Sequence, residues 1–220
     1  MIEPYKIVRS NRKTLAISVD TFGRLIVRAP KRCAEDRIFA FLQQKESWIL
    51  RKQQERRGAG MDLPPDNLDG YGFLLLGQSV KIVLCDEKRV GYDSENGRIF
   101  LPKEKSKERL VKWLKENAKR ILSTVTQRKA AEMGLAYKSI SVTSARTRWG
   151  TCSGDNALRY TFRLLYCPKE IIDYVVVHEL AHIRHKNHSL LFWQEVEKYI
   201  PDWKIRRKWL KSHGILMEIF

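Results

Sequence analysis

Residues 175–193 of this 220-residue chain read VVVHELAHIRHKNHSLLFW and contain four of its five histidines. His178 and His182 are four positions apart, so on a helix their imidazoles lie on one face, one turn apart, and can bind one metal ion. The preceding residues are apolar on nearly every side, and ionisable groups buried there are costly unless they are paired or metal-bound. The stretch therefore predicts a metal site on a buried helix rather than a chance cluster of core histidines.

Glu179 is the predicted general base of this site. It lies about 100° around the helix from His178, too far round to be a natural third ligand, yet it can reach a water on the metal. His-Glu-x-x-His is a known signature of zinc metalloproteases, in which the two histidines bind zinc and the glutamate is the base.

A third ligand is expected, because a catalytic zinc ion usually has three protein ligands and one open position. Five residues separate His182 from His188, as between the second and third histidines of the pattern HExxHxxGxxH. His188 is therefore the favoured third ligand. Glu195 and Glu197 are the alternatives, since some zincins use a glutamate from the following helix.

The segment between the ligands departs from that pattern, because His185 stands where it has glycine. We interpret His185 as a surface histidine. Lys186 and Asn187 are expected to make the turn, since asparagine tolerates the left-handed conformation better than most residues. Ser189 is then expected to cap a helix over residues 190–200.

The composition is that of a strongly basic globular protein. Lysine and arginine number 42 against 25 acidic residues, a formal net charge of +17, which favours polyanionic partners. The cysteines are widely spaced without a CxxC pair, and the first 20 residues have no signal-peptide pattern. The longest apolar run, FLLL at 73–76, is far shorter than the ~20 residues that span a bilayer. These features predict a cytoplasmic protein outside the membrane.

Residues 1–102 are predicted to be β-rich with one helix. Alternating apolar residues predict three strands in a meander over 5–30, and spacing near 3.6 predicts a helix over 34–57. Two further strands are expected over 73–85 and 97–102.

Residues 103–220 are predicted to form the catalytic domain, either separately or in one continuous unit with the first part. Helical spacing covers 103–133 with Gly134 as the expected C-cap, and strands are expected over 139–145 and 158–166. Pro168 stands where the next helix is expected to begin. The helix that carries HELAH follows. The sequence thus predicts an α+β fold in which this helix packs on a small mixed β-sheet.

Several segments resemble those of one family. They are VRSNRKTLAISVDTFGRLIVRAP (8–30), SARTRWGTCS (144–153), VVHELAHIRHKNHSLLFW (176–193) and PDW (201–203). Together they are similar to the YgjP-like metallopeptidases, also described as metal-dependent hydrolases and related to the WLM and SprT-like zinc proteases. The resemblance covers most of the chain. It implies a zincin-like fold, one zinc ion held by His178, His182 and His188, and Glu179 as the catalytic residue.

Arg148 is a candidate substrate-binding residue, if the segment 144–153 borders the cleft as in other zincins. A guanidinium group there could bind a carboxylate or a phosphate with two hydrogen bonds. A structural role is equally compatible with the pattern, with Trp149 in the core and Gly150 allowing a bend.

The favoured function is a zinc-dependent hydrolase, foremost a peptidase with a peptide or protein substrate. Zinc would polarise the scissile carbonyl and lower the pKa of its water to about 7, while Glu179 transfers the proton to the leaving amine.

Two alternatives remain open. The first is a metal-dependent nucleotide phosphoanhydride hydrolase, a nucleoside triphosphate pyrophosphatase, motivated by the net charge and by Arg146, Arg148, Arg159 and Arg163. The second is a module that binds nucleic acid through its basic surface and holds a structural metal. Three histidines without a fourth protein ligand argue against the second.

Overall fold

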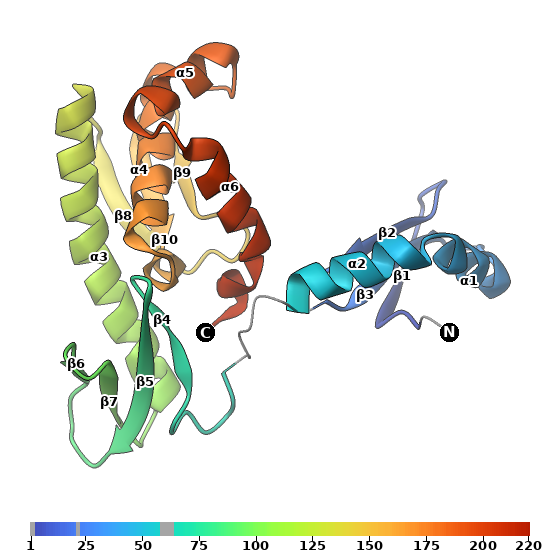
Figure 1. Ribbon diagram of the computed structural model, residues 1–220, viewed down its shortest axis with the longest axis horizontal. Helices are drawn as coiled ribbons and strands as arrows, with labels where there is room; N and C mark the ends of the chain where they lie inside the picture. The colour runs from blue at the N-terminus through green and yellow to red at the C-terminus, as the bar shows by residue number, and fades with distance from the viewer. Residues whose placement is uncertain (1–2, 21–22, 58–63) are drawn as a thin grey trace. The chain divides into compact units, whose positions relative to one another are not determined.

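The computed structural model describes residues 3–20, 23–57 and 64–220 (Figure 1). The chain divides into two compact units, Met1–Met61 with Lys211–Ile215 and Asp62–Leu210 with Leu216–Phe220. The predicted boundary at residues 102 and 103 lies inside the second unit. The described residues form six α-helices and three sheets with both parallel and antiparallel pairs, which confirms the predicted α+β class.

The first unit contains a three-stranded sheet of β1 (Lys6–Ser10), β2 (Ala16–Val19) and β3 (Leu25–Pro30). The strand order is β1-β3-β2, with β1 parallel and β2 antiparallel to β3, so the predicted meander is wrong. The central strand is the one with the deepest apolar face, on which Leu25, Val27 and Ala29 are all buried. As the central strand, β3 is hydrogen-bonded to a neighbouring strand at each edge.

Two helices follow, α1 (Glu35–Gln44) and α2 (Glu46–Arg57), where the sequence predicted a single helix. The helix is interrupted at Lys45, whose N–H donates to the Leu42 carbonyl three residues back instead of four. Ile38, Leu42 and Ile49 nevertheless remain in one buried cluster with the apolar face of β3. The interruption therefore leaves both helices packed on the same cluster.

The second unit begins with a four-stranded sheet of β4 (Gly72–Leu75), β5 (Gln78–Cys85), β6 (Gly91–Asp93) and β7 (Arg98–Pro102), in the order β4-β5-β7-β6. The predicted strand over 73–85 is a hairpin of β4 and β5. Leu76 and Gly77 both have positive φ, as a two-residue hairpin turn requires. Strand β6 was not predicted.

The long helix α3 (Ser106–Met133) runs along the second unit, with the β4–β7 sheet at its start and β8 beside its later turns (Figure 1). Leu110, Leu114, Ala118 and Leu122 are buried at every fourth position and form its inner stripe. Gly134 ends the helix in the left-handed conformation, which confirms the predicted C-cap.

A three-stranded sheet contains β8 (Ser139–Thr143), β9 (Gly150–Cys152) and β10 (Ala157–Thr161), in the order β8-β10-β9. The strand predicted over 158–166 ends at Thr161, and Phe162–Tyr166 form a 3-10 helix, η1. All five side chains of η1 are buried. In a strand, successive side chains point to opposite faces of the sheet, so one buried face would not cover all five. The Thr161 side chain also caps this turn by accepting the Arg163 N–H.

The C-terminal part consists of α4 (Lys169–Arg184), α5 (Leu190–Tyr199), α6 (Trp203–Ser212) and a short 3-10 helix, η2 (Gly214–Glu218). Pro168 precedes α4, where the sequence predicted a helix start. Helix α4 contacts α3, α5 and β9 and is thus enclosed on several sides.

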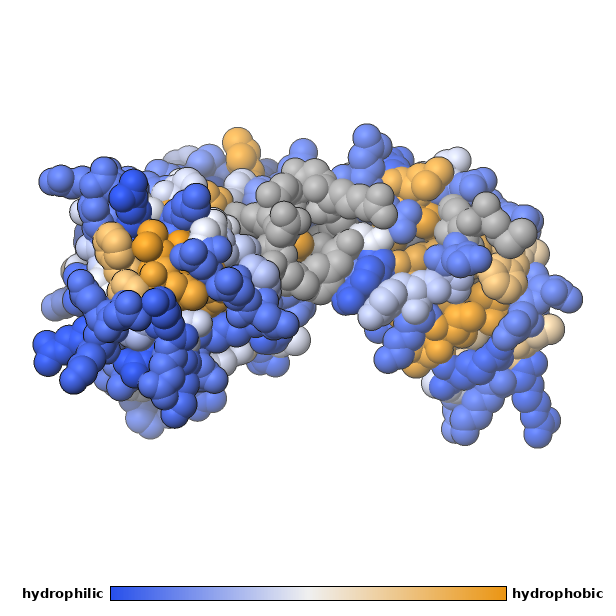
Figure 2. All heavy atoms as spheres, turned by 90° about the horizontal axis from the view of Figure 1, so that it is seen from below, coloured by the Kyte–Doolittle hydropathy of each residue, from blue (hydrophilic) through white to orange (hydrophobic). Residues whose placement is uncertain are grey.

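The face drawn in Figure 2 is mostly hydrophilic. No helix among the described residues is long and apolar enough to cross a membrane.

Candidate metal centre

The candidate metal ligands lie in the last turns of α4 and in the loop that follows it. His178 and His182 are half-buried on α4, and His188 is exposed in the loop before α5. One ligand atom from each of these histidines lies within 4.8 Å of the others, and Nε2 of His178 is 3.1 Å from Nε2 of His188. The structure thus brings together the three histidines predicted from the sequence, which could hold one metal ion.

The loop between α4 and α5 turns without a left-handed residue. His185 is extended (φ −127°, ψ 100°), and Asn187 is absent from the described non-glycine residues with positive φ, so the left-handed turn expected there is wrong. The Asn187 side chain instead accepts the Ser189 N–H at 3.3 Å and makes a local turn. Ser189 in turn accepts the Phe192 N–H at 3.4 Å, which confirms the predicted cap of α5.

A backbone carbonyl fixes the tautomer of His182. Nδ1 of His182 lies 3.0 Å from the carbonyl oxygen of His185, and a carbonyl can only accept. The proton is therefore on Nδ1, which leaves the lone pair of Nε2 free for a metal. His185 thus supports the cluster through its backbone carbonyl, a role that was not predicted from the sequence.

His178 is held neutral by its surroundings. Burial, followed by the charges of His182, His188 and Arg207, lowers the pKa of His178 to about 3. Its Nδ1 is buried and has no hydrogen-bond partner among the described residues. A neutral imidazole with an available lone pair is the form that binds a metal.

Glu179 is buried between α4 and the edge strand β9, with 6% of its surface exposed. Burial raises the pKa of its carboxyl group to about 8, and a hydrogen bond from the Cys152 backbone N–H opposes this rise. A Cβ added to Gly150 would lie 2.7 Å from Glu179 Cγ. Gly150, interpreted from the sequence as a site for a bend, therefore also makes room for this carboxyl group.

Aromatic rings from α5 and α6 form a wall beside the histidines. Trp193 stacks on His188 with ring centroids 5.6 Å apart, and the Phe192 ring lies 4.5 Å from that of His182. Trp203 stacks on Trp193 at 4.0 Å. These rings were not predicted as part of the site, although they lie in the segments LLFW and PDW that carry the family resemblance.

The other candidates lie outside the histidine cluster. Glu195 is buried and forms ion pairs with Arg184 and, at 3.0 Å, with Lys198. Glu197 is exposed. Arg148 is also exposed, and within the described ranges it forms no hydrogen bond or ion pair. The group of potential ligands in the described chain is His178, His182 and His188.

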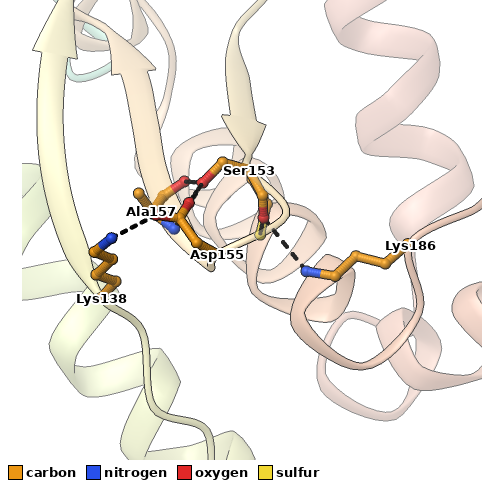
Figure 3. A network of polar contacts seen from close by, with 6 residues as sticks. Lys138, Ser153, Asp155, Ala157 and Lys186 are labelled. Atoms are coloured by element: carbon orange, nitrogen blue, oxygen red, sulfur yellow. Dashed lines mark hydrogen bonds and ion pairs between the residues drawn. The ribbon is translucent and has the colours of Figure 1, made fainter.

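A polar network ties the loop that carries His188 to the turn between β9 and β10 (Figure 3). Lys186 Nζ donates to Asn156 Oδ1 at 2.7 Å and to the Ser153 carbonyl at 3.4 Å. The Ser153 hydroxyl donates to Asp155, which also pairs with Lys138 at 2.6 Å. Segments far apart in the sequence are thereby held together at one side of the cluster.

Two solved structures are similar to part of this chain. The metallopeptidase zymogen abylysin of Pyrococcus abyssi is 20% identical with a TM-score of 0.38, and the alignment covers 41% of this chain and 93% of that chain. The metallopeptidase zymogen jannalysin of Methanocaldococcus jannaschii is 19% identical with a TM-score of 0.37, covering 41% and 91%.

None of the curated proteins searched matches this chain. A family model does: the model of the YgjP-like metallopeptidase domain matches residues 13–213, which include most of both compact units and every candidate ligand. The resemblance noted in the sequence is thereby confirmed, and the chain belongs to the YgjP-like metallopeptidase family.

Proposed function

We propose that the protein is a zinc-dependent peptidase of zincin-like architecture, with α4 as its active-site helix. The observation that carries the proposal is the cluster of three imidazole ligand atoms within 4.8 Å of one another, on the helix that also carries the buried Glu179. Membership of a metallopeptidase family implies a catalytic metal and a peptide or protein substrate.

The donor set fits one zinc ion. Imidazole nitrogens suit this metal, and three protein ligands leave one coordination position open, as in catalytic rather than structural sites. His178 is neutral, and the proton of His182 is on the nitrogen that faces the His185 carbonyl. His178 and His182 would therefore bind the ion through neutral imidazoles, and His188 would complete the set of three ligands.

Glu179 is the proposed general base. Zinc, when bound, supplies Lewis-acid activation of the scissile carbonyl and of the attacking water. The Glu179 carboxylate accepts a proton from that water at one Oε atom and delivers it to the leaving amine. The Cys152 N–H orients the carboxylate through its hydrogen bond. Burial raises the pKa of Glu179 above its usual value, so its carboxylate is a stronger proton acceptor than an exposed one.

The edge strand β9 favours a peptide as the substrate. It pairs only with β10 in its sheet of the described chain, and its Gly150 and Cys152 face Glu179. An unpaired strand edge offers main-chain donors and acceptors to an extended peptide, which would add a strand to the sheet. A peptide bound in this way would pass the catalytic carboxylate.

The alternative of a nucleotide phosphoanhydride hydrolase has less support. Arg163 is buried, where its guanidinium donates to the carbonyls of Ser144 and Ile219, and Arg146 pairs with Glu218 at 3.5 Å. These two cations are therefore already engaged within the chain. A structural metal is also less well supported, because the described chain offers three clustered ligands and no fourth.

Metal analysis combined with one substitution tests the proposal. We expect the purified protein to contain one zinc ion per chain, and Glu179→Gln to keep the zinc while hydrolysis of casein or a peptide library falls by roughly 10²–10⁴-fold. A panel of nucleoside triphosphates is assayed in parallel. Unchanged hydrolysis in Glu179→Gln would contradict the mechanism, and pyrophosphate release without peptide cleavage would establish the nucleotide alternative.

A further inference from the structure

Arg207 of α6 lies beside the metal centre. Its Cζ is 5.0 Å from the centroid of the Trp193 ring, which lies 5.7 Å from the ring of His178 and 5.6 Å from that of His188. Its charge also contributes to the lowered pKa of His178. The guanidinium group therefore lies one aromatic ring away from the predicted ligands.

The hydrogen-bond donors of Arg207 are available. A guanidinium that lies over an indole face uses its π surface and leaves its N–H groups at the edge. Arg207 forms no ion pair or hydrogen bond within the described parts of the chain, and its side chain is exposed. Its neighbour Arg206 differs, because it donates to the Glu170 carbonyl at 2.7 Å and pairs with Asp202 at 2.8 Å. Arg206 has a structural role, and Arg207 does not share it.

Three carboxylates on the surrounding helices are occupied by other partners. Asp173 of α4 pairs with Arg128, Asp202 at the start of α6 pairs with Arg206, and Glu195 of α5 pairs with Arg184 and Lys198. Glu179, the carboxyl group next to the ligands, is directed at β9. None of these four carboxyl groups forms an ion pair with Arg207.

A second cation, Lys186, lies in the loop that carries His188. It donates only to neutral oxygens of Ser153 and Asn156. Lys186 in this loop and Arg207 on α6 thus place two positive charges near the metal centre. Such a site attracts an anionic ligand and disfavours a cationic one.

We propose that Arg207 binds a carboxylate of the peptide substrate and thereby selects where the peptide is cleaved. A guanidinium group matches a carboxylate through two parallel N–H···O bonds, and the Trp193–Trp203 stack beneath Arg207 holds it in place. The carboxylate belongs either to an Asp or Glu side chain or to the free C-terminus of the peptide. The inference rests on the proposed peptidase function and names its substrate class.

Binding to the zinc-loaded, full-length Glu179→Gln protein tests the inference without requiring turnover. The probes are three pools of N-acetylated octapeptides: neutral with an amidated C-terminus, neutral with a free C-terminus, and Glu-containing with an amidated C-terminus. Quenching of tryptophan fluorescence at about 0.15 M salt gives the affinities, since screening there limits long-range attraction to ~8 Å. The variants are Arg207→Gln, Arg207→Lys and, as a matched control, Lys204→Gln.

Lys204 is a suitable control because it lies on the same helix, over the Trp203 ring at 5.5 Å, and carries the same charge. We expect the protein to prefer one carboxylate-bearing pool over the neutral amidated pool by about tenfold or more. Arg207→Gln should abolish this preference, Arg207→Lys should weaken it, and Lys204→Gln should retain it. The preferred pool identifies a side-chain or a C-terminal carboxylate.

Equal affinity for the three pools, or an equal effect of Arg207→Gln and Lys204→Gln, would overturn the inference. A carboxylate preference in a protein that cleaves no peptide would support Arg207 and refute the peptidase function. Peptide cleavage without any such preference would support the peptidase function and refute the role of Arg207. The two proposals therefore fail separately.

Discussion

Gly150 on β9 lies directly against the side chain of Glu179 on α4. A Cβ added to Gly150 would fall 2.7 Å from Glu179 Cγ and 2.8 Å from Oε1, closer than real Cβ contacts. Gly150 is not among the residues with positive φ, so space rather than backbone conformation requires glycine there. β9 and α4 can approach this closely only because residue 150 has no side chain.

Gly150→Ala should therefore displace the proposed base. We expect kcat to fall by about ten- to a hundredfold, because small displacements of a catalytic group are costly, while the zinc content stays unchanged. Gly154→Ala is the matched control, since an added Cβ there meets nothing within 4 Å. Peptidase kinetics and metal analysis check both variants, and equal activities would show that Glu179 does not need this space.

His188→Ala and His185→Ala should differ sharply in zinc affinity. His188 contributes a ligand atom to the cluster, whereas His185 contributes its backbone carbonyl, which alanine also has. We expect His188→Ala to weaken zinc binding by more than about a hundredfold, beyond the usual effect of losing a group that only supports a ligand. Competition with a chromogenic chelator measures both variants. A large loss in His185→Ala would instead point to its imidazole as a ligand.

Glu195→Gln should lower stability in a pH-dependent way. Burial favours the neutral acid, but the hydrogen bond from Lys198 and the charges of Arg184 and Lys198 outweigh it and hold the pKa of Glu195 below its usual value. A carboxyl group with a lowered folded-state pKa stabilises the fold above its unfolded pKa of about 4.3 and loses this contribution as the pH falls through the folded value.

We therefore expect Glu195→Gln to reduce the free energy of unfolding by about 1–2 kcal/mol at pH 7, and by less below pH ~4. Urea unfolding at both pH values measures the difference. Glu197→Gln is the control, because Glu197 lies on the same helix and is exposed. A stability loss that did not shrink in acid would mean that packing, rather than charge, is responsible.

Arg163→Met should be more destabilising than Arg159→Met, because Arg163 is buried in η1 whereas Arg159 is exposed on β10. Arg163 is fully buried, and its removal leaves the Ser144 and Ile219 carbonyls without their donors. We expect a loss of at least about 2 kcal/mol in the free energy of unfolding, against ~0.5 kcal/mol or less for Arg159→Met. Denaturant titration compares the two. A large loss of hydrolysis in Arg159→Met with unchanged stability would revive the anion-binding role considered for these arginines.

The sequence predicted the features that depend on local chemistry. The spacing of His178 and His182, the cap at Ser189 and the helix end at Gly134 each follow from the residues of one short segment. Periodicity likewise predicted α3 and the α+β class. The family resemblance, carried by several segments, agreed with the spacing argument for His188.

Features that depend on pairing between distant segments were missed. The order β1-β3-β2 requires a parallel pair that strand patterns do not specify, and the buried run over Phe162–Tyr166 looks the same in a strand as in a 3-10 helix. Gly150 and Glu179 are in contact although they are about 30 positions apart in the sequence. Arg207 and Trp193, which also lie close together, are 14 positions apart. Only tertiary structure brings them together.

The tether formed by Lys186 has a consequence for how the ion is acquired. Its bonds to Ser153 and Asn156 anchor the loop two residues before His188, so the third imidazole is already restricted before any metal arrives. Part of the conformational entropy of that loop is therefore lost during folding and would not be lost again on metal uptake. Lys186 would thus raise the affinity for the ion without touching it.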